Sequence, residues 1–277
     1  MRAKPVFGHA IELAPDHKTG LALNIPVMTA AGCWGFADEY ADLVDFSKLG
    51  ALVTNPITFH PRPPANNTQA IPIPSGTLVH TGLPNPGMKA TVQKYAEKWK
   101  RLACPIIVHV AASDYQEAES CLDEVEGVEN VVAVELGFPD DIHPKDAETI
   151  IMAAAGGMLP VITRLPFMRA IEFARISERA GAQVLTAAAP PRGTVPDKTG
   201  KSWISGRLYG TFVFSLALHL VKNLLGMTTL PVIASGGIHT RDQAFAFLKV
   251  GAAAIQLDSL VWTDPMAVAQ IVAELTG

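Results

Sequence analysis

The sequence has few cysteines and no excess of positive charge. Its three cysteines, Cys33, Cys104 and Cys121, lie far apart in the 277 residues, so neither a disulfide framework nor a paired-cysteine metal site is indicated, and we expect no metal. Each is predicted to be a small buried hydrophobic residue. The 22 basic and 26 acidic residues give a formal net charge of −4. A nucleic-acid or membrane-surface partner would need a basic patch, so both classes are disfavoured.

Long apolar segments are also missing. No window reaches the roughly 18 uninterrupted apolar residues of a membrane span, and the N-terminal MRAKPVFGHA lacks the apolar run of a signal peptide. We therefore expect a soluble, cytoplasmic protein. Hydrophobic residues make up 49% of the chain against 17% charged residues, which is ample for one large core. No linker or shift in composition divides the chain, so we expect a single domain over residues 1–277.

Eight short apolar runs, rich in β-branched residues, recur along the chain. Continuous rather than alternating runs are typical of parallel strands that are covered on both faces. The runs are residues 26–32, 50–57, 104–112, 131–137, 159–165, 182–189, 230–237 and 252–260, and helical patterns follow them at 39–50, 91–103, 114–128, 145–157, 168–182, 207–227, 241–251 and 266–277. Repeated strand-then-helix units predict a (β/α)8 TIM barrel. An open doubly wound sheet is the alternative, disfavoured because no GxGxxG follows the first run.

Two connections are much longer than the few residues usual between a strand and its helix. They are residues 58–87 after the second strand and 189–206 after the sixth. Both fall at the C-terminal end of the barrel, where barrel enzymes carry their active sites. We interpret these long loops as lids or binding loops, with decorative surface as the alternative.

Paired glycines follow the seventh strand in the segment ASGGIHT, residues 234–240. Glycines let the backbone approach a ligand, and the start of the next helix offers free N–H groups. Since such barrels often bind phosphate after strands 7 and 8, we predict a phosphate site at Gly236 and Gly237; a helix cap without ligand is the alternative. Asp258 would repel a phosphate there, so we expect its side chain to turn away and Ser259 to donate instead.

Several segments carry a family resemblance when they are taken together. They are PVMTAAGCWG, GALVTNPIT, GTLVHTGLPNPG, ISGRLYGTFVFSLALHLV and PVIASGGIHTRDQAFAFLKVGAAAIQLDS. Between roughly residues 20 and 262 the chain resembles the dihydroorotate dehydrogenase family of FMN-dependent barrels, for which GLPNPG is a hallmark. The resemblance implies FMN on the C-terminal face of the barrel and, by the habit of the family, a homodimer or a partner subunit.

The resemblance also implies which residues lie near the cofactor and the substrate. The flavin ring would lie over small residues at the end of the first strand, its phosphate would be held by backbone near the glycines, and the GLPNPG segment would contact the substrate. His109 could bond to the flavin or substrate, or be a satisfied barrel histidine. The implied cofactor set is Ala30, Ala31, Gly32, Thr54, Asn55, His109, Gly206, Gly236, Gly237 and Ser259, and the implied substrate set is Thr81 and Asn85.

Departures from the family pattern are as informative as the matches. Asn55 and Arg164 stand where the family has lysines, and Arg164 keeps the positive charge that would sit beside the flavin. After the fourth strand the family has an asparagine and a Ser-Cys-Pro-Asn-like segment, whose Cys or Ser takes the substrate proton. This chain has Gly137–Asp141 there. Because asparagines in several loops grip orotate, their loss predicts that the substrate is not dihydroorotate.

The titratable groups of the same loop are candidates for the missing base. Asp140, Asp141 and His143 could accept a proton above a flavin, or they could serve as turn and helix-cap residues. Inside the barrel, Glu135 of the fourth strand is predicted to pair with Arg164. We expect the basic residues of the two long loops to be solvated rather than bound to an acidic substrate; they are Arg62, His80, Arg192, Lys198 and Lys201.

Three functions remain open at this point. The first is an FMN-dependent oxidoreductase of the CH–CH type, similar to dihydroorotate dehydrogenase but acting on another small molecule. The second is a degenerate barrel that binds a ligand or joins a complex without catalysis. The third is a lyase or isomerase that holds a phosphorylated substrate at the phosphate site after strands 7 and 8.

Overall fold

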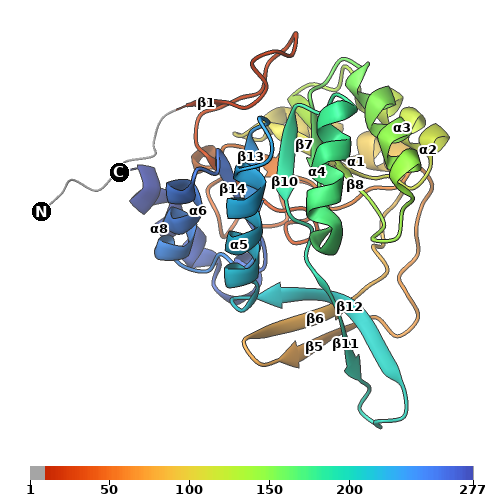
Figure 1. The fold of residues 1–277 in the computed structure, drawn as a ribbon, viewed down its shortest axis with the longest axis vertical. Coiled ribbons are helices and arrows are strands. Elements are labelled where there is room, and N and C mark those ends of the chain that lie inside the picture. Colours follow the sequence, from red (N-terminus) through yellow and green to blue (C-terminus); the bar gives the residue numbers. More distant parts are fainter. Residues whose placement is uncertain (1–9, 277) are drawn as a thin grey trace, which may run out of the picture.

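The barrel is formed by eight short parallel strands. The computed structural model describes residues 10–276. Residues 1–9 and Gly277 lie outside the described residues, and residues 1–9 are most of the N-terminal segment in which we expected no signal peptide. The strands are β3 (Val27–Thr29), β4 (Leu52–Val53), β7 (Ile106–Ala111), β8 (Val131–Gly137), β9 (Val161–Arg164), β10 (Val184–Ala187), β13 (Val232–Ser235) and β14 (Ala254–Leu257). Their order is β3-β14-β13-β10-β9-β8-β7-β4, and a parallel bridge between Met28 and Ala51 joins the two ends. The predicted (β/α)8 TIM barrel is confirmed (Figure 1).

Each strand is buried on both faces because it has the barrel interior on one side and helices on the other. Ile107 and Ile162 belong to a core cluster inside the barrel, whereas their neighbours Ile106 and Val161 belong to the larger cluster beneath the helices. Alternate residues of a strand point to opposite faces. Continuous apolar runs are therefore what this architecture requires, and all eight predicted runs contain a strand.

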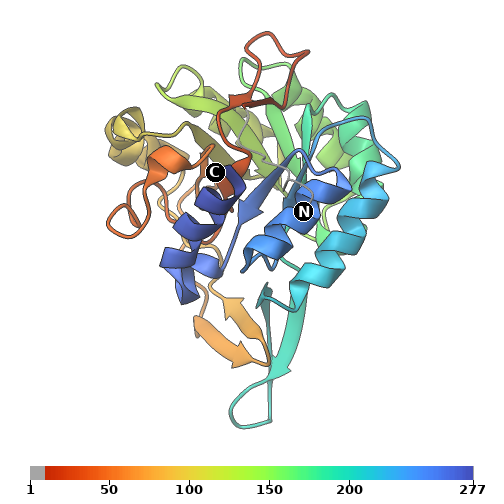
Figure 2. The same ribbon diagram turned by 90° about the vertical axis from the view of Figure 1, so that its left-hand side faces the viewer.

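A short N-terminal hairpin closes the end of the barrel at which the strands begin. It consists of β1 (Ile11–Glu12) and β2 (Ala22–Leu23), and Leu13, Leu21 and Leu23 are buried in the interior cluster. Figure 2 shows the hairpin at the end opposite the projecting sheet. The apolar plug leaves the other end, where the strands finish, as the open face of the barrel.

Helices cover the outside of the barrel in all but the first unit. They are α1 (Met88–Arg101), α2 (Tyr115–Val125), α3 (Pro144–Ala155), α4 (Ala170–Arg179), α5 (Val213–Leu225), α6 (Arg241–Val250) and α8 (Pro265–Thr276), with short turns η1 (Phe46–Lys48), η2 (Phe167–Arg169) and α7 (Leu260–Thr263). The helix predicted over residues 39–50 is wrong. Asp45 accepts hydrogen bonds from the backbone and side chain of Ser47, and such local bonds compete with helix formation.

The two long connections meet in one antiparallel sheet. The strands are β5 (Gln69–Ile73), β6 (Gly76–His80), β11 (Arg192–Pro196) and β12 (Trp203–Gly210), in the order β11-β12-β6-β5. The sheet projects from the C-terminal end of the barrel (Figures 1 and 2). The two connections, which we interpreted as lids or binding loops, thus share one sheet. The predicted helix over 207–227 begins later, at Val213, because residues 207–210 belong to β12.

The described helices include none that is long and apolar enough to cross a bilayer. The three cysteines are free and buried, which confirms their predicted role as small buried residues.

Candidate functional site

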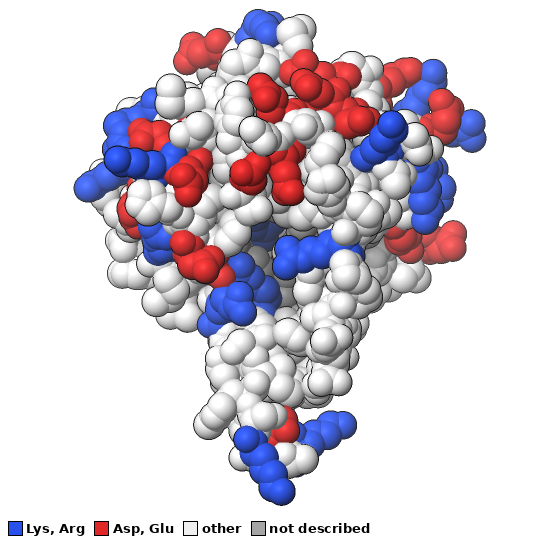
Figure 3. Space-filling model, turned by 90° about the vertical axis from the view of Figure 1, so that its right-hand side faces the viewer, with Lys and Arg blue, Asp and Glu red and all other residues white. Residues whose placement is uncertain are grey.

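A cavity of about 240 Å³ lies where the strands end and the projecting sheet begins. Its walls come from the ends of β3, β7, β8 and β9, from the two long connections and from β12. Four arginines line it, Arg62, Arg164, Arg192 and Arg207, and we call it the arginine-lined cavity. Figure 3 shows basic side chains gathered around a hollow at the junction of sheet and barrel. A cavity with convergent charged groups at this end of a barrel is the default candidate for a ligand site.

The floor of the arginine-lined cavity is a buried polar layer centred on Glu135. Glu135 is fully buried, and Arg164 Nη1 lies 3.3 Å from its Oε1, so the predicted pair is confirmed. Its other oxygen accepts from Thr186 Oγ1 at 2.7 Å and Gln256 Nε2 at 2.8 Å. Burial pushes the pKa of Glu135 upward, but the Arg164 charge and the hydrogen bonds prevail and lower the pKa below its usual range. The carboxylate therefore stays ionised.

His109 is a neutral member of the same layer. Its Nδ1 lies 2.7 Å from Glu135 Oε1, and burial lowers its pKa although Glu135 opposes the shift. A neutral imidazole that donates from Nδ1 has an unprotonated Nε2. A Cβ built on Gly137 would collide with that nitrogen. The glycine that ends β8 is thus required by the histidine on β7, and an asparagine would not fit here.

Arg164 presents a free donor to the cavity. The residue is 3% exposed, its Nη1 contacts Glu135 and Gln256 at 3.3 Å each, and its Nη2 has no hydrogen-bond partner within residues 10–276. A buried donor without a partner costs free energy. A ligand with an acceptor oxygen in the arginine-lined cavity would supply the missing bond.

Of the three candidate bases in the segment after β8, two line the arginine-lined cavity and one does not. Asp140 lines the cavity and pairs with Arg207 at 2.8 Å and with Arg192 at 3.8 Å. Asp141 lines the cavity and is exposed. His143 caps α3, with Nδ1 accepting from Lys145 N at 3.3 Å, and lies outside the cavity lining among the described residues. For His143 the cap interpretation is confirmed.

The two implied substrate residues are occupied by the chain itself. Asn85 is 7% exposed. Its Oδ1 accepts from the backbone N of Thr58 and Gly87, and its Nδ2 donates to Thr58 Oγ1 and Leu83 O. Thr81 Oγ1 accepts from Leu83 N at 3.4 Å. In the described part of the chain neither residue lines the arginine-lined cavity, so Asn85 fastens its loop rather than reaching a substrate there.

The residues expected around a flavin ring are also bonded within the chain. Asn55 Oδ1 accepts from Gly35 N at 3.3 Å, and Thr54 Oγ1 accepts from His109 N at 3.0 Å. Ala30 is buried, whereas Ala31 and Gly32 line the cavity. Gly206 is a ladder residue of β12, where a Cβ would collide with the Val79 carbonyl of β6.

The expected phosphate site holds a carboxylate of the chain. Asp258 Oδ2 accepts from Gly237 N at 3.2 Å, and Oδ1 accepts from Ser259 N at 2.6 Å and Ser259 Oγ at 3.2 Å. The expectation that Asp258 turns away is therefore wrong. Gly236 packs its Cα against α5, and Ser259 Oγ also meets His239 Nε2 at 3.2 Å. Asp258 is 3% exposed, so it is held in this position by surrounding atoms.

Tyr209 stands over the first strand's end, where the resemblance implies the flavin ring. A Cβ on Gly32 would come within 3.3 Å of its hydroxyl, and its ring packs edge-on against Trp262 with 4.9 Å between centroids. With Asp258 on the backbone donors and Tyr209 above Gly32, FMN does not fit this end of the barrel as the side chains stand. Within residues 10–276, no group of three or more His, Cys, Asp or Glu side chains is arranged for a metal ion.

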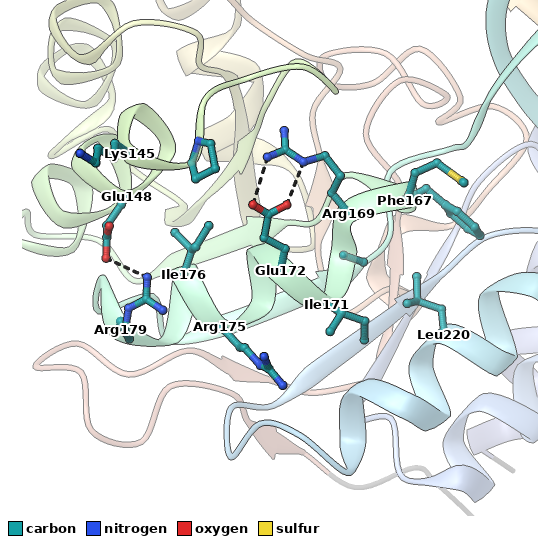
Figure 4. A pocket seen from close by; sticks show the side chains of 13 residues that line it. Lys145, Glu148, Phe167, Arg169, Ile171, Glu172, Arg175, Ile176, Arg179 and Leu220 are labelled. Atoms are coloured by element: carbon teal, nitrogen blue, oxygen red, sulfur yellow. Dashed lines mark hydrogen bonds and ion pairs between the residues drawn. The ribbon is translucent and has the colours of Figure 1, made fainter.

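A second cavity lies on the outer flank, between α3 and α4 (Figure 4). Four of its labelled charged side chains form two facing pairs, with Arg169 Nε 2.9 Å from Glu172 and Arg179 3.2 Å from Glu148. Such solvent-accessible charges are already paired with each other and screened by water, so they offer little to a ligand. This flank cavity therefore lacks the buried free donor that marks the arginine-lined cavity.

Several residues of the site escaped prediction from sequence. No spacing pattern marks the four missed residues, which lie in apolar or glycine-rich stretches; they are Thr186, Arg207, Tyr209 and Gln256. For Thr186 and Gln256 the alternation of a barrel strand, which points every second side chain inward, could have predicted the position. Arg62 and Arg192, expected to be solvated only, line the cavity.

Comparisons with known proteins agree with this picture of the fold. Residues 16–148 and 173–277 match the family model for dihydroorotate dehydrogenase. The chain is similar to the catalytic subunit of dihydroorotate dehydrogenase B (NAD(+)) from Geobacillus sp. (strain WCH70), with 29% identity over 92% of this chain and 87% of the relative. The subunit of the same name from Listeria welshimeri is 30% identical over 92% of this chain and 90% of the relative. A crystal structure of DHODH from Eimeria tenella in complex with ferulenol has a TM-score of 0.73 at 17% identity, covering 95% and 83% of the two chains, which supports the fold.

Proposed function

This chain belongs to the dihydroorotate dehydrogenase family of oxidoreductases, and we propose that its ligand is a small anionic compound other than dihydroorotate. The compound binds in the arginine-lined cavity. The observation that carries this proposal is the buried guanidinium of Arg164, which lines the cavity and whose Nη2 is unpartnered among the residues described.

Charge in the cavity favours a carboxylate or a similar anion. Arg164 is already paired with Glu135, and Asp140 is shared by Arg207 and Arg192. Counting the lining residues, four arginines face two acids, Asp140 and Asp141. The surplus is positive, and a guanidinium bonds planar oxyanions with two parallel N–H groups.

Dihydroorotate is disfavoured by the same geometry. A site that grips its ring amides and its carboxylate needs several amide side chains, but Asn85 is bonded to its own loop and Gly137 has His109 across it. A buried polar ligand group left without a partner costs about 1–3 kcal/mol. Several such losses together support a different substrate.

Thermal unfolding with small carboxylates tests the proposal. Fumarate and succinate are expected to raise the Tm of the wild type, whereas orotate is expected to give a weaker shift or none. Arg164→Gln removes a charge-assisted hydrogen bond and should weaken carboxylate binding roughly 10- to 100-fold. Arg175→Gln, on the outer flank, is the matched control and should respond like the wild type. Equal responses of both variants, or an orotate shift as large as the best carboxylate's, would refute the proposal.

FMN-dependent hydride transfer is the second candidate, and Arg164 is the observation that favours it. The resemblance implies a cation beside the flavin at this position, and Arg164 keeps one. This candidate requires that Asp258 and Tyr209 leave their present positions. If Asp258 and Tyr209 stay where they are, the proposal is that the barrel binds its ligand without turnover.

A partner subunit is part of the proposal on the strength of the relatives. Proteins similar to this chain are named catalytic subunits, and we propose that this chain also assembles, either with a different subunit or as a homodimer. Light scattering of the purified chain separates the cases: a homodimer gives twice the mass of 29.5 kDa. A monomer that captures no partner when tagged in its native cells would contradict both.

A further inference from the structure

We propose that this chain binds no FMN at the end of its barrel, because its own side chains occupy the cofactor's place. Asp258 takes the position of the phosphate, and Tyr209 takes the position of the ring. The phosphate end of this inference concerns β13, β14 and the start of α7, none of whose described residues lines the arginine-lined cavity, whereas the ring end concerns Tyr209 of β12, which does line it.

The phosphate end is filled by a carboxylate with a complete set of donors. Gly237 N, Ser259 N and Ser259 Oγ all donate to Asp258. These are the donors that a phosphate needs at the start of a helix after strands 7 and 8. An aspartate that accepts bonds from them has the same charge sign and the same acceptor chemistry as the phosphate. Asp258 is therefore an internal substitute for it.

Charge repulsion adds to the loss of donors. Within residues 10–276 no Lys or Arg forms an ion pair with Asp258, so a phosphate beside it would meet a negative charge that no ion pair offsets. A phosphate monoester carries about −1.5 to −2 charges at neutral pH. Two like charges a few ångströms apart in a buried site weaken binding by at least about 100-fold.

The ring end is closed by an aromatic pair. Tyr209 is 7% exposed and packs edge-on against Trp262 at 4.9 Å, while Trp262 Nε1 donates to Cys33 O at 3.1 Å. Tyr209 belongs to β12, where it pairs with Thr77 of β6. The ring is thus fixed by the projecting sheet on one side and by the barrel on the other.

Tyr209 also separates two cavities that a flavin would have to join. One is the arginine-lined cavity, and the other is bounded by β5, β6, His239, Ser259 and α7. Tyr209 lines both of them. A cofactor with its ring over Gly32 and its phosphate at Ser259 would pass through the tyrosine. Both ends and the middle of the cofactor's path are therefore taken by the chain.

The first experiment measures flavin in the wild-type protein. The chain is purified from cells supplied with riboflavin, and the released flavin is quantified by absorbance; FMN and riboflavin are then titrated and followed by quenching of flavin fluorescence. We expect less than one-tenth of an equivalent of flavin, by the repulsion described above, and no saturable quenching by either compound. Stoichiometric FMN, or saturable binding of either flavin, would overturn the inference. Riboflavin belongs in the test because it lacks the phosphate and so probes Tyr209 separately.

The second experiment uses inorganic phosphate as the probe. Asp258→Ala frees the donors of Gly237 and Ser259, so phosphate is expected to raise the Tm of this variant more than that of the wild type at equal ionic strength. Asp264→Ala, which removes a nearby exposed carboxylate, should behave like the wild type. If Asp258→Ala does not fold, Asp258→Asn removes the charge in the same shape. Equal phosphate responses of wild type and the folded Asp258 variant would contradict the assignment. Because these readouts do not involve Arg164, they can fail while carboxylate binding succeeds, and the reverse.

Discussion

Replacing Arg164 by methionine is expected to destabilise the fold by about 3–5 kcal/mol, the usual result of leaving a buried charge without its partner. Methionine has a similar length and fills the space of the aliphatic stem. It leaves Glu135, which is fully buried, with its hydrogen bonds from His109, Thr186 and Gln256. These three donors are neutral: Thr186 and Gln256 do not ionise, and burial lowers the pKa of His109. The carboxylate would therefore lose the cation that Arg164 supplies.

A double-mutant cycle separates this effect from lost packing. The free energy of unfolding is measured by urea denaturation for the wild type, Arg164→Met, Glu135→Met and the double variant. An ion pair buried among apolar groups can be replaced with little change in stability, so the double variant should lose less than the sum of the two single losses. We expect a coupling energy of about 2–3 kcal/mol.

The pH dependence gives a second readout of the same pair. The pKa of Glu135 is lowered in the folded protein, so its contribution to stability is complete above the unfolded value of about 4.3 and is lost as the pH falls through the folded value. Without Arg164 the folded pKa should rise, and the loss should begin at higher pH. The reasoning is refuted if Arg164→Met costs less than about 1 kcal/mol, or if the two single losses add.

Three further predictions concern the loops and strands around the cavity. Gly137→Ala should cost about 1–3 kcal/mol by overpacking, and His109→Ala in the same chain should recover part of it in urea denaturation. Because burial lowers the pKa of His109, the unfolded chain takes up a proton first, so the free energy of unfolding should fall below about pH 6.5, and less steeply in His109→Gln. Asn85→Ala should cost about 1–3 kcal/mol and speed limited proteolysis within residues 58–87, whereas unchanged cleavage would show that Asn85 does not fasten the loop.

The barrel could be predicted from the sequence because each of its strands can be recognised without knowing which strand it pairs with. A strand with helices on one side and a filled interior on the other is apolar over consecutive positions, as Ile106 to Val108 illustrate, and such runs are visible along the chain. The helix after the first strand could not be excluded in the same way. Residues 39–50 have helical spacing, but Asp45 bonds to Ser47, which is a local choice that spacing does not reveal.

The projecting sheet was out of reach for a different reason. Its edge strands β5 and β11 alternate between exposed and half-buried positions, and all four strands contain proline or glycine. Their pairing joins Arg207 to Val79 across more than a hundred residues. A pattern of alternation does not say which distant segment supplies the hydrogen bonds, so the sequence pointed to the right end of the barrel and to the wrong structure there.

The end of the barrel that carries the candidate site could be predicted from the sequence, but the state of its residues could not. Whether Asp258 faces the backbone donors or solvent depends on a rotation about one side chain, and the sequence is the same in both cases. The residues that replace the family pattern also depend on one another: His109 fits only because position 137 is glycine, and Arg164 is neutralised by a glutamate two residues before that glycine. Taken singly, each residue that departs from the family pattern suggests a lost function. Together they form a layer whose charges are satisfied within the chain, and among the described residues Arg164 Nη2 is its free donor into the arginine-lined cavity. The selectivity of the site should therefore follow from guanidinium chemistry rather than from the amide contacts of the family.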